Sequence, residues 1–345
     1  MPGVKTECTE LSVGFGLLGL DPINASQDEV NSLFAHTLTA EKYKRFKSEF
    51  GRNPDFYNRL FIVGRNIQLS YPPFQNITSV QWLGPQQQAS TASVAIDLRA
   101  NQTPISVKAQ SNVVWNPSPY NLFKSVPQGR AMADRTDNWY LVSALPEFQE
   151  LYSFIHDKYL PNLPGDIQDF EATASKKSRK RIQSIIKTFG ENEKAEFEKR
   201  YIAFCHSVAI HSANLFNDNI KQALQSPIRN SIYEIIARNF FRFDMMQYLL
   251  CGIDRNHDFA VVIPDITTWK REWAFTTIEA IPDLTRRQSV VDFHIAFQNK
   301  TTRITNEVNF HSEIRWSHGK FCGSPEAKLY KEFKWSELQF FSIII

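Results

Sequence analysis

Residues 291–316 carry the most restrictive pattern in the chain. Apolar and polar side chains alternate from Val291 to Phe297 and, after a turn at residues 298–301, alternate again as far as Trp316. Because successive side chains of a strand point to opposite faces, this period predicts a long hairpin with one buried face. The other face of its second strand is polar, with Arg303, Thr305, Glu307, Asn309, His311, Glu313 and Arg315.

The rest of the chain predicts a mixed α+β protein. Ser26 and Glu29 have the spacing of a capping box at the start of a helix, and a second helix is expected from Thr39 to Gly51. Short strands are expected at residues 60–63, 79–83, 93–98, 105–107 and 141–144, and further strands at 259–263 and 273–281. Longer helices are expected over residues 147–160, 197–216 and 227–243.

Length and composition favour a two-domain globular protein. The 345 residues suggest two domains, and the loop at residues 161–165 suggests their boundary, giving a region 1–165 and a region 166–345. The formal net charge of +3 is too small to indicate a nucleic-acid partner by itself. Four scattered cysteines and the lack of a long apolar run favour a cytoplasmic protein with no membrane partner.

The segment around residue 100 suggests a chemical site. Two apolar runs, residues 92–98 and 104–110, flank a short polar connection, and Asp97 and Lys108 interrupt them. If the two runs pair as antiparallel strands, Asp97 comes to lie near Ser106 or Lys108. Ser106, Lys108 and Gln110 then share one face of the second strand.

An acid and a lysine in this arrangement suit phosphodiester hydrolysis. Mg²⁺ binds one or two carboxylates and fills its remaining positions with water and phosphate oxygens. The bound ion polarises the phosphate and lowers the pKa of an attacking water, and a nearby lysine can orient that water or offset negative charge.

These residues resemble the PD-(D/E)xK nuclease superfamily. An Asp, followed about ten residues later by an acid or Ser, any residue and Lys, on adjacent strands behind an N-terminal helix, is the pattern of that group, and the Ser106-Val107-Lys108 form resembles some type II restriction endonucleases. The resemblance covers residues 28–160. It departs from the pattern at Ile96, where members have Pro, and at Ser106, where most have an acid.

The resemblance implies a second acid supplied from another element. One known solution, a glutamate about fourteen residues after the lysine, is absent because Leu122 stands there. The helix before the sheet is the commonest donor in such folds, so Glu41 and Glu49 are preferred, as catalytic and metal-binding residues. The alternatives are Glu29, Asp134, Asp137 and Glu147.

Two rival sites stay open. In the first, Asp265 and Asp283 each follow a proline, and Glu326 and Lys328 form a literal Glu-x-Lys. However, Gly323–Pro325 predicts a turn into a helix before Glu326. Lys328, Lys331 and Lys334 would then form a basic stripe on that helix. The Asn-His pair at residues 256–257 suggests an HNH-type nuclease. It lacks the expected upstream and downstream ligands.

Several polar segments are candidates for DNA contact. Residues 176–181 form the densest basic run, and residues 315–321 surround a glycine with cations, a hydroxyl and an imidazole. The candidate DNA-binding residues are Lys176, Lys177, Arg179, Arg303, Asn309, His311, Arg315, Ser317, His318 and Lys320.

The resemblance implies a Mg²⁺-dependent endonuclease that cuts double-stranded DNA at a specific sequence, as a type II restriction enzyme does. A homodimer would match a palindromic site, and a bacterial or archaeal cytoplasm would be its location. The alternatives are a non-catalytic sequence-specific DNA-binding protein, an HNH-type nuclease, and a structural or interaction protein.

Overall fold

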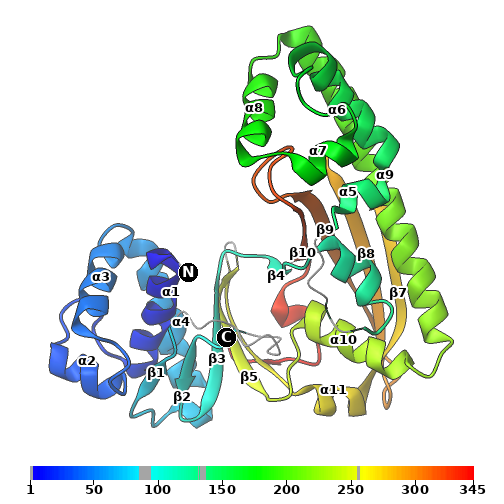
Figure 1. The fold of residues 1–345 in the computed structure, drawn as a ribbon. Coiled ribbons are helices and arrows are strands. Elements are labelled where there is room, and N and C mark those ends of the chain that lie inside the picture. The colour runs from blue at the N-terminus through cyan, green and yellow to red at the C-terminus, as the bar shows by residue number, and fades with distance from the viewer. Residues whose placement is uncertain (1–2, 85–94, 131, 133–136, 255–256) are drawn as a thin grey trace. The chain divides into compact units, whose positions relative to one another are not determined.

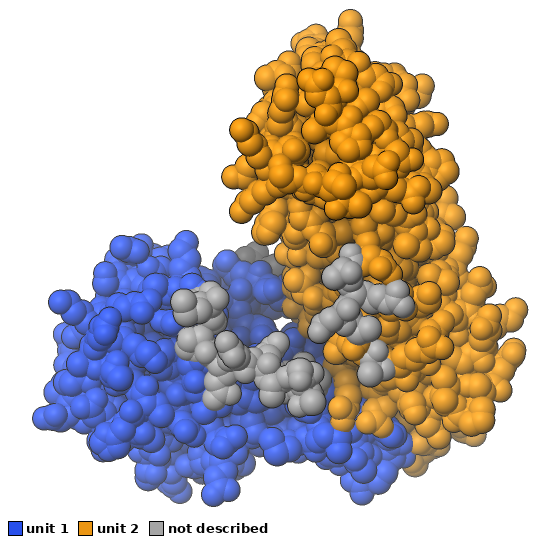
Figure 2. Space-filling model, in the orientation of Figure 1, with its two compact units in different colours: residues 1–112, 241–272, 333–345 blue, residues 113–240, 273–332 orange. Residues whose placement is uncertain are grey.

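The computed structural model describes residues 3–84, 95–130, 132, 137–254 and 257–345. Helices and two separate sheets alternate along the chain, which confirms the expected α+β class (Figure 1). The described residues form two compact units, coloured separately in Figure 2. Unit 1 comprises residues 1–112, 241–272 and 333–345, and unit 2 comprises residues 113–240 and 273–332.

This division differs from the predicted boundary at residue 165. The chain leaves unit 1 after residue 112, returns at residue 241, and returns again for its last thirteen residues, 333–345. The reason is the strand β5 (Tyr248–Asp254), which pairs in parallel with β3 (Thr103–Ala109) and so joins residues far apart in sequence. Sequence patterns of local period carry no sign of such a pairing.

Unit 1 begins with four helices: α1 (Val4–Leu18), α2 (Gln27–Leu33), α3 (Ala40–Phe50) and α4 (Pro54–Ser70), followed by the short helix η1 (Pro72–Phe74). The predicted capping box of Ser26 and Glu29 starts α2, and Thr39 caps α3, which ends at Gly51. Helix α4 contains residues 60–63, which were wrongly predicted as a strand. Pro54 opens this helix, and Tyr57, Leu60, Val63 and Ile67 are buried at helical spacing.

The helices of unit 1 pack beside a six-stranded sheet of order β1-β2-β3-β5-β6-β11. The strands not yet defined are β1 (Val80–Trp82), β2 (Leu98–Ala100), β6 (His257–Ile263) and β11 (Ser342–Ile343). Every pair is antiparallel except β3 with β5. Helix α11 (Ile266–Glu272) and the short helix η3 (Trp335–Glu337) complete the unit.

Unit 2 contains an antiparallel sheet of order β4-β10-β9-β8-β7. Its strands are β4 (Val113–Trp115), β7 (Trp273–Asp283), β8 (Ser289–Asn299), β9 (Thr305–Trp316) and β10 (Pro325–Lys331). The predicted hairpin is β8 with β9, and Val308, Phe310, Ile314 and Trp316 are buried as the alternation requires. Strand β10 occupies the segment that was predicted to turn into a helix, because pairing with β9 extends from Pro325 to Lys331.

The helices of unit 2 are η2 (Asn121–Ser125, a π-helix), α5 (Trp139–Ser143), α6 (Leu145–Tyr159), α7 (Ile167–Thr173), α8 (Lys176–Lys187), α9 (Glu191–Leu224) and α10 (Arg229–Phe241, whose last residue lies in unit 1). The long helix α9 lies along β7 and β8 (Figure 1). Residues 141–144 were predicted as a strand but belong largely to α5, because the Asn138 side chain accepts a hydrogen bond from the Tyr140 backbone and caps a helix there. No helix among the described residues has the length and apolar character needed to cross a membrane.

Candidate active site

Asp97 and Ser106 meet in unit 1, as the hairpin pattern predicted. Strands β2 and β3 pair with Leu98 opposite Ile105, and the Asp97 backbone N–H continues the ladder by donating to the Ile105 carbonyl. Oδ2 of Asp97 accepts a hydrogen bond from the Val107 backbone at 2.7 Å and one from Ser106 Oγ at 3.4 Å. The carboxylate is therefore fixed against β3, and its Oδ1 has no hydrogen-bond partner among the described residues.

Lys108 is held in place by the neighbouring strand β5. Lys108 lies opposite Gly252 in the parallel pair, and Gly252 has φ +142°. A Cβ atom at this position would come within 1.7 Å of the Lys108 carbonyl oxygen. Only glycine fits here. Gly252 therefore allows the backbones of β3 and β5 to approach closely, and this contact fixes the position of Lys108.

The sequence reasoning missed a second acid, Glu10 of α1. Its side chain is only 5% exposed, and its Oε2 accepts a hydrogen bond from Trp82 Nε1 at 2.8 Å. The charges of Asp97 and Lys108 both act on its carboxyl group, which shows that the three side chains belong to one cluster. The available signal was a glutamate in the middle of an apolar helix, where the residues from Cys8 to Leu17 are all buried, because a buried acid is costly unless it has a partner or a function.

Small residues bring α1 close to its neighbouring helix. A Cβ atom on Gly16 would lie 2.0 Å from the Phe61 carbonyl oxygen of α4, and one on Gly64 would lie 2.2 Å from the Val13 carbonyl oxygen of α1. The two backbones therefore touch at these glycines, and a side chain at either position would force the helices apart. This contact fixes α1, and with it Glu10, relative to the sheet.

The pKa values of the three side chains in the cluster are shifted from their usual values. Burial, with the nearby negative charge of Asp97, raises the pKa of Glu10 to about 7. Burial also raises the pKa of Asp97, against the opposing effects of Lys108 and Arg242. The pKa of Lys108 falls to about 8, through burial first and the like charge of Arg242 second. Groups with pKa values moved toward neutrality are typical of active sites, because they can exchange protons and bind ions near pH 7.

Lys108 has a further property that suits a reacting group. Its Nζ forms no hydrogen bond and no ion pair with any described residue, although two carboxylates act on its pKa. Arg242, the other cation of the cluster, is 8% exposed. When all four groups are ionised, Glu10 and Asp97 balance Lys108 and Arg242, so the cluster has no net charge before a metal or a phosphate binds.

The preferred second acids, Glu41 and Glu49, lie elsewhere. Glu41 is exposed on α3. Glu49 is buried, but Oε1 accepts from the Tyr57 hydroxyl at 3.1 Å and Oε2 pairs with Arg52 at 3.1 Å. Neither acts on the pKa of Asp97 or Lys108. The inference that an N-terminal helix supplies the acid therefore points to α1 rather than α3, because α1 is the helix that contacts β1 and β3.

The remaining sequence candidates have other partners, lie in unit 2 or fall outside the described residues. Glu29 is used in the capping box of α2, and Glu147 of unit 2 accepts a hydrogen bond from Ser207. Asp137 is exposed in unit 2, and Asp134 lies outside the described residues. Gln110 follows β3 and is exposed, with φ +56°. The strand ends at Ala109, so Gln110 does not continue the face of Ser106 and Lys108.

The described residues of the two rival sites are engaged in other interactions or divided between the two units. Asp265 of unit 1 caps α11 through the Thr267 and Thr268 backbones, whereas Asp283 and Glu326 lie in unit 2. Glu326 pairs with Arg315 and Lys328 across and along the sheet. For the HNH alternative, residues 255–256 are outside the described part, and His257 opens the strand β6 rather than the helix that such a site requires.

The metal-binding capacity of the cluster rests on two carboxylates. No group of three or more His, Cys, Asp or Glu side chains with the arrangement of a metal site occurs among the described residues. Glu10 and Asp97 each keep one carboxylate oxygen without a hydrogen-bond partner in the described structure. This donor set fits Mg²⁺, which needs only one or two carboxylates when water and substrate phosphate complete its shell.

The candidate DNA-binding residues divide into paired and exposed groups. His311 bonds to Glu332, Arg315 pairs with Glu313 and Glu326, Lys320 pairs with Glu198, and Arg179 pairs with Glu171. The exposed residues are Lys176, Lys177, Arg303, Asn309, Ser317 and His318. Arg303 lies in the turn before β9, so it does not share a strand face with Asn309 as the alternation suggested.

Comparisons of this chain with protein-family models, with curated proteins and with solved structures find no match.

Proposed function

We propose that the protein is a Mg²⁺-dependent endonuclease acting on double-stranded DNA, with its active site at Glu10, Asp97 and Lys108. The proposal rests on one observation: in unit 1, two carboxylates with raised pKa values interact with a lysine that has a lowered pKa and no ion-pair partner among the described residues. The arrangement also supports the resemblance to the PD-(D/E)xK superfamily, with Glu10 supplying the acid that Ser106 replaces.

Each residue has a role that follows from its surroundings. Glu10 and Asp97 would hold the cation, each through the oxygen that has no hydrogen-bond partner. When bound, Mg²⁺ polarises the phosphate and lowers the pKa of the attacking water. Ser106 and the Val107 backbone keep Asp97 oriented, and Trp82 keeps Glu10 oriented.

Lys108 is suited to handling the proton of the attacking water. With a pKa of about 8, part of its population is neutral near pH 8 and can accept a proton at Nζ. In its charged form it offsets the negative charge that develops on the phosphate. The water oxygen forms the new bond to phosphorus, and the bond to the departing sugar oxygen breaks.

Unit 2 offers the cations for contact with the DNA backbone. Lys176 and Lys177 are exposed at the start of α8, and Arg181 extends the basic run. Such contacts position DNA without reading its sequence. Asn309 is an exposed amide on β9 and is a candidate for a base contact in the major groove. Sequence specificity, a restriction-modification role and a homodimer are proposals that rest on the family resemblance alone. The proposal of a cytoplasmic location rests also on the four scattered cysteines.

The test is incubation of the purified protein with phage DNA and Mg²⁺. We expect discrete bands from the unaltered protein and no cleavage by the Asp97→Ala and Lys108→Ala variants. Glu7→Gln, on the same helix as Glu10, is the matched control and should keep cleavage activity. Cleavage by the first two variants at the normal rate would show that the site assignment is wrong.

One observation favours a second candidate, a non-catalytic sequence-specific DNA-binding protein. Ser106 is fully buried where most members of the resembling family have an acid, so a nuclease fold could have lost its metal here. This candidate predicts salt-sensitive DNA binding with no Mg²⁺-dependent nicking of any duplex.

A further inference from the structure

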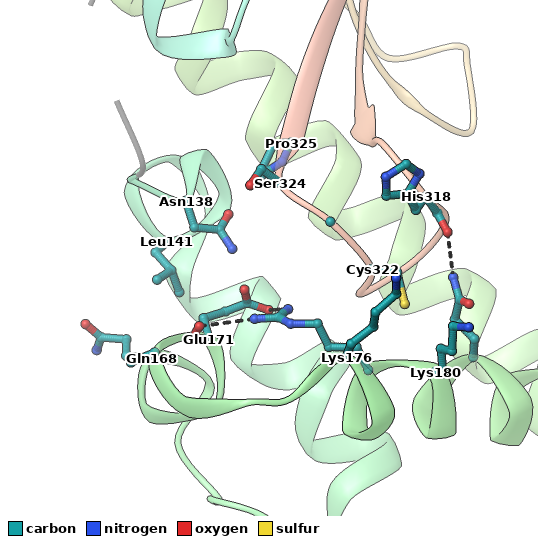
Figure 3. Close-up of a pocket in the computed structure, with 14 residues that line it drawn as sticks. Asn138, Leu141, Gln168, Glu171, Lys176, Lys180, His318, Cys322, Ser324 and Pro325 are labelled. Atoms are coloured by element: carbon teal, nitrogen blue, oxygen red, sulfur yellow. Dashed lines mark hydrogen bonds and ion pairs between the residues drawn. The ribbon is translucent and has the colours of Figure 1, made fainter. Parts of the chain in front are cut away.

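A pocket of about 740 Å³ lies within unit 2, and none of its lining residues belongs to the proposed active site. Figure 3 shows it between α5, the α7–α8 region and the loop that precedes β10. Its volume falls in the range of about 300–1,000 Å³ typical of small-molecule sites. It is lined by Asn138, Leu141, Gln168, Glu171, Ala172, Lys176, Arg179, Lys180, Gln183, His318, Cys322, Gly323, Ser324 and Pro325.

The pocket has an excess of positive charge. Arg179 and Glu171 neutralise each other through an ion pair of 2.8 Å, and Arg179 also donates to the Glu171 and Phe321 carbonyls. Lys176 and Lys180 are exposed and have no ion pair with any described residue. Two unneutralised ammonium groups on one wall therefore favour an anionic ligand.

The walls of the pocket are tied together. Gln183 of α8 donates to the His318 carbonyl at 2.9 Å, and Arg179 bonds to the Phe321 carbonyl of the same loop. These bonds hold the cationic helix against the loop of residues 317–324. A site whose walls are already fixed loses less entropy when a ligand binds.

The remaining lining suits a flat heterocycle. Leu141 and Pro325 provide apolar surface opposite α8, as Figure 3 shows. Asn138 and Gln168 bring side-chain amides, which donate and accept hydrogen bonds at once as the edges of nucleobases require. The Asn138 oxygen accepts from the Tyr140 backbone, which leaves its amide N–H groups to donate.

We propose that this pocket binds one nucleoside phosphate, with Lys176 and Lys180 contacting the phosphate and the amide side chains contacting the base. The ligand is a free mononucleotide or a single nucleotide unit of a nucleic-acid chain, which share this chemistry. The proposal does not depend on the nuclease activity of unit 1, because no residue of the pocket belongs to that cluster.

The test is isothermal titration of the full-length protein with adenosine 5′-monophosphate, adenosine, inorganic phosphate and a short single-stranded oligonucleotide. We expect one nucleotide per chain, bound more tightly than adenosine or phosphate. The double variant Lys176→Gln/Lys180→Gln should weaken binding at least about tenfold, as the loss of two charge-assisted contacts implies. The matched control, Lys187→Gln/Lys194→Gln, removes two exposed cations of unit 2 that do not line the pocket and have no part in the proposed DNA contact, so it should bind normally.

The outcomes are distinct. Tight mononucleotide binding that needs the two lysines identifies a free nucleotide as the ligand, whereas lysine-dependent binding of the oligonucleotide alone identifies a unit of a chain. The proposal is overturned if neither ligand binds, if inorganic phosphate binds as tightly as the nucleotide, or if both double variants lose affinity equally. Melting temperatures confirm that both variants are folded, and both alter only exposed side chains.

Discussion

Replacing Glu10 with glutamine should make the protein more stable at alkaline pH and abolish its proposed activity. The reason is that the folded environment disfavours the charged carboxylate, since burial and Asp97 raise its pKa from 4.5 to about 7. The unfolded chain releases this proton near pH 4.5, whereas the folded chain keeps it until about pH 7. The stability of the wild-type protein therefore falls as pH rises between these values.

The magnitude follows from the size of the pKa change. At about 1.4 kcal/mol for each pKa unit, the ionised Glu10 lowers the free energy of unfolding by about 3 kcal/mol above pH 7. Glutamine has nearly the same shape, keeps an oxygen that can accept from Trp82 Nε1, and has no charge. We expect Glu10→Gln to raise the melting temperature by several degrees at pH 8, and to have little effect at pH 4.

Calorimetry with and without Mg²⁺ measures this effect. Mg²⁺ should raise the melting temperature of the wild-type protein at pH 8, because binding favours the folded state, and should leave Glu10→Gln unchanged. Glu49→Gln is the structural comparison, since it replaces another buried glutamate that has its own partners, Tyr57 and Arg52, and should bring no gain in stability. A Glu10→Gln protein that is less stable than the wild type at pH 8 would refute the reasoning.

Three other predictions follow from the same geometry. Gly252→Ala should separate β3 from β5, because the added Cβ would come within 1.7 Å of the Lys108 carbonyl oxygen. We expect the free energy of unfolding to fall by about 2 kcal/mol or more and DNA cleavage to be lost. Normal cleavage activity would contradict this. Lys108→Met should raise the melting temperature at pH 7, because the folded protein then carries a buried charge that lowers its stability. The substitution should bring no gain above about pH 10.5, because Lys108 is then neutral in both the folded and the unfolded chain. The cleavage rate at low Mg²⁺ should rise through pH 7 as Glu10 ionises, and Asp97→Ala should be inactive at every pH, so a rate independent of pH between 6 and 8 would argue against Glu10 as a ligand.

Local patterns predicted those parts of the fold that local forces determine. The β8–β9 hairpin, the capping box of α2 and the pairing of Asp97 with Ser106 all depend on neighbouring residues or on a single turn. The parallel pairing of β3 with β5 depends on residues far apart in the chain, and the sequence contains no local signal for it. For the same reason the two units could not be delimited from the sequence.

The candidate site shows the same limit. Asp97 and Lys108 were found because one tight hairpin brings them together. Glu10 was missed because it reaches them only through the packing of α1 against α4 and the sheet, which Gly16 and Gly64 permit. Glu41 and Glu49 were chosen by their helix position, but the neighbouring residues of α3 pack Glu49 toward Tyr57 instead.

The central claim is that Glu10 and Asp97 together hold one divalent cation beside Lys108. The most direct measurement is a calorimetric titration of the protein with Mg²⁺ at pH 7, in buffers of different ionisation enthalpy. We predict one ion per chain, with release of a proton from Glu10, and no binding by either the Glu10→Gln or the Asp97→Asn protein. Binding that survives both substitutions, or no binding by the wild-type protein even with DNA present, would contradict the account.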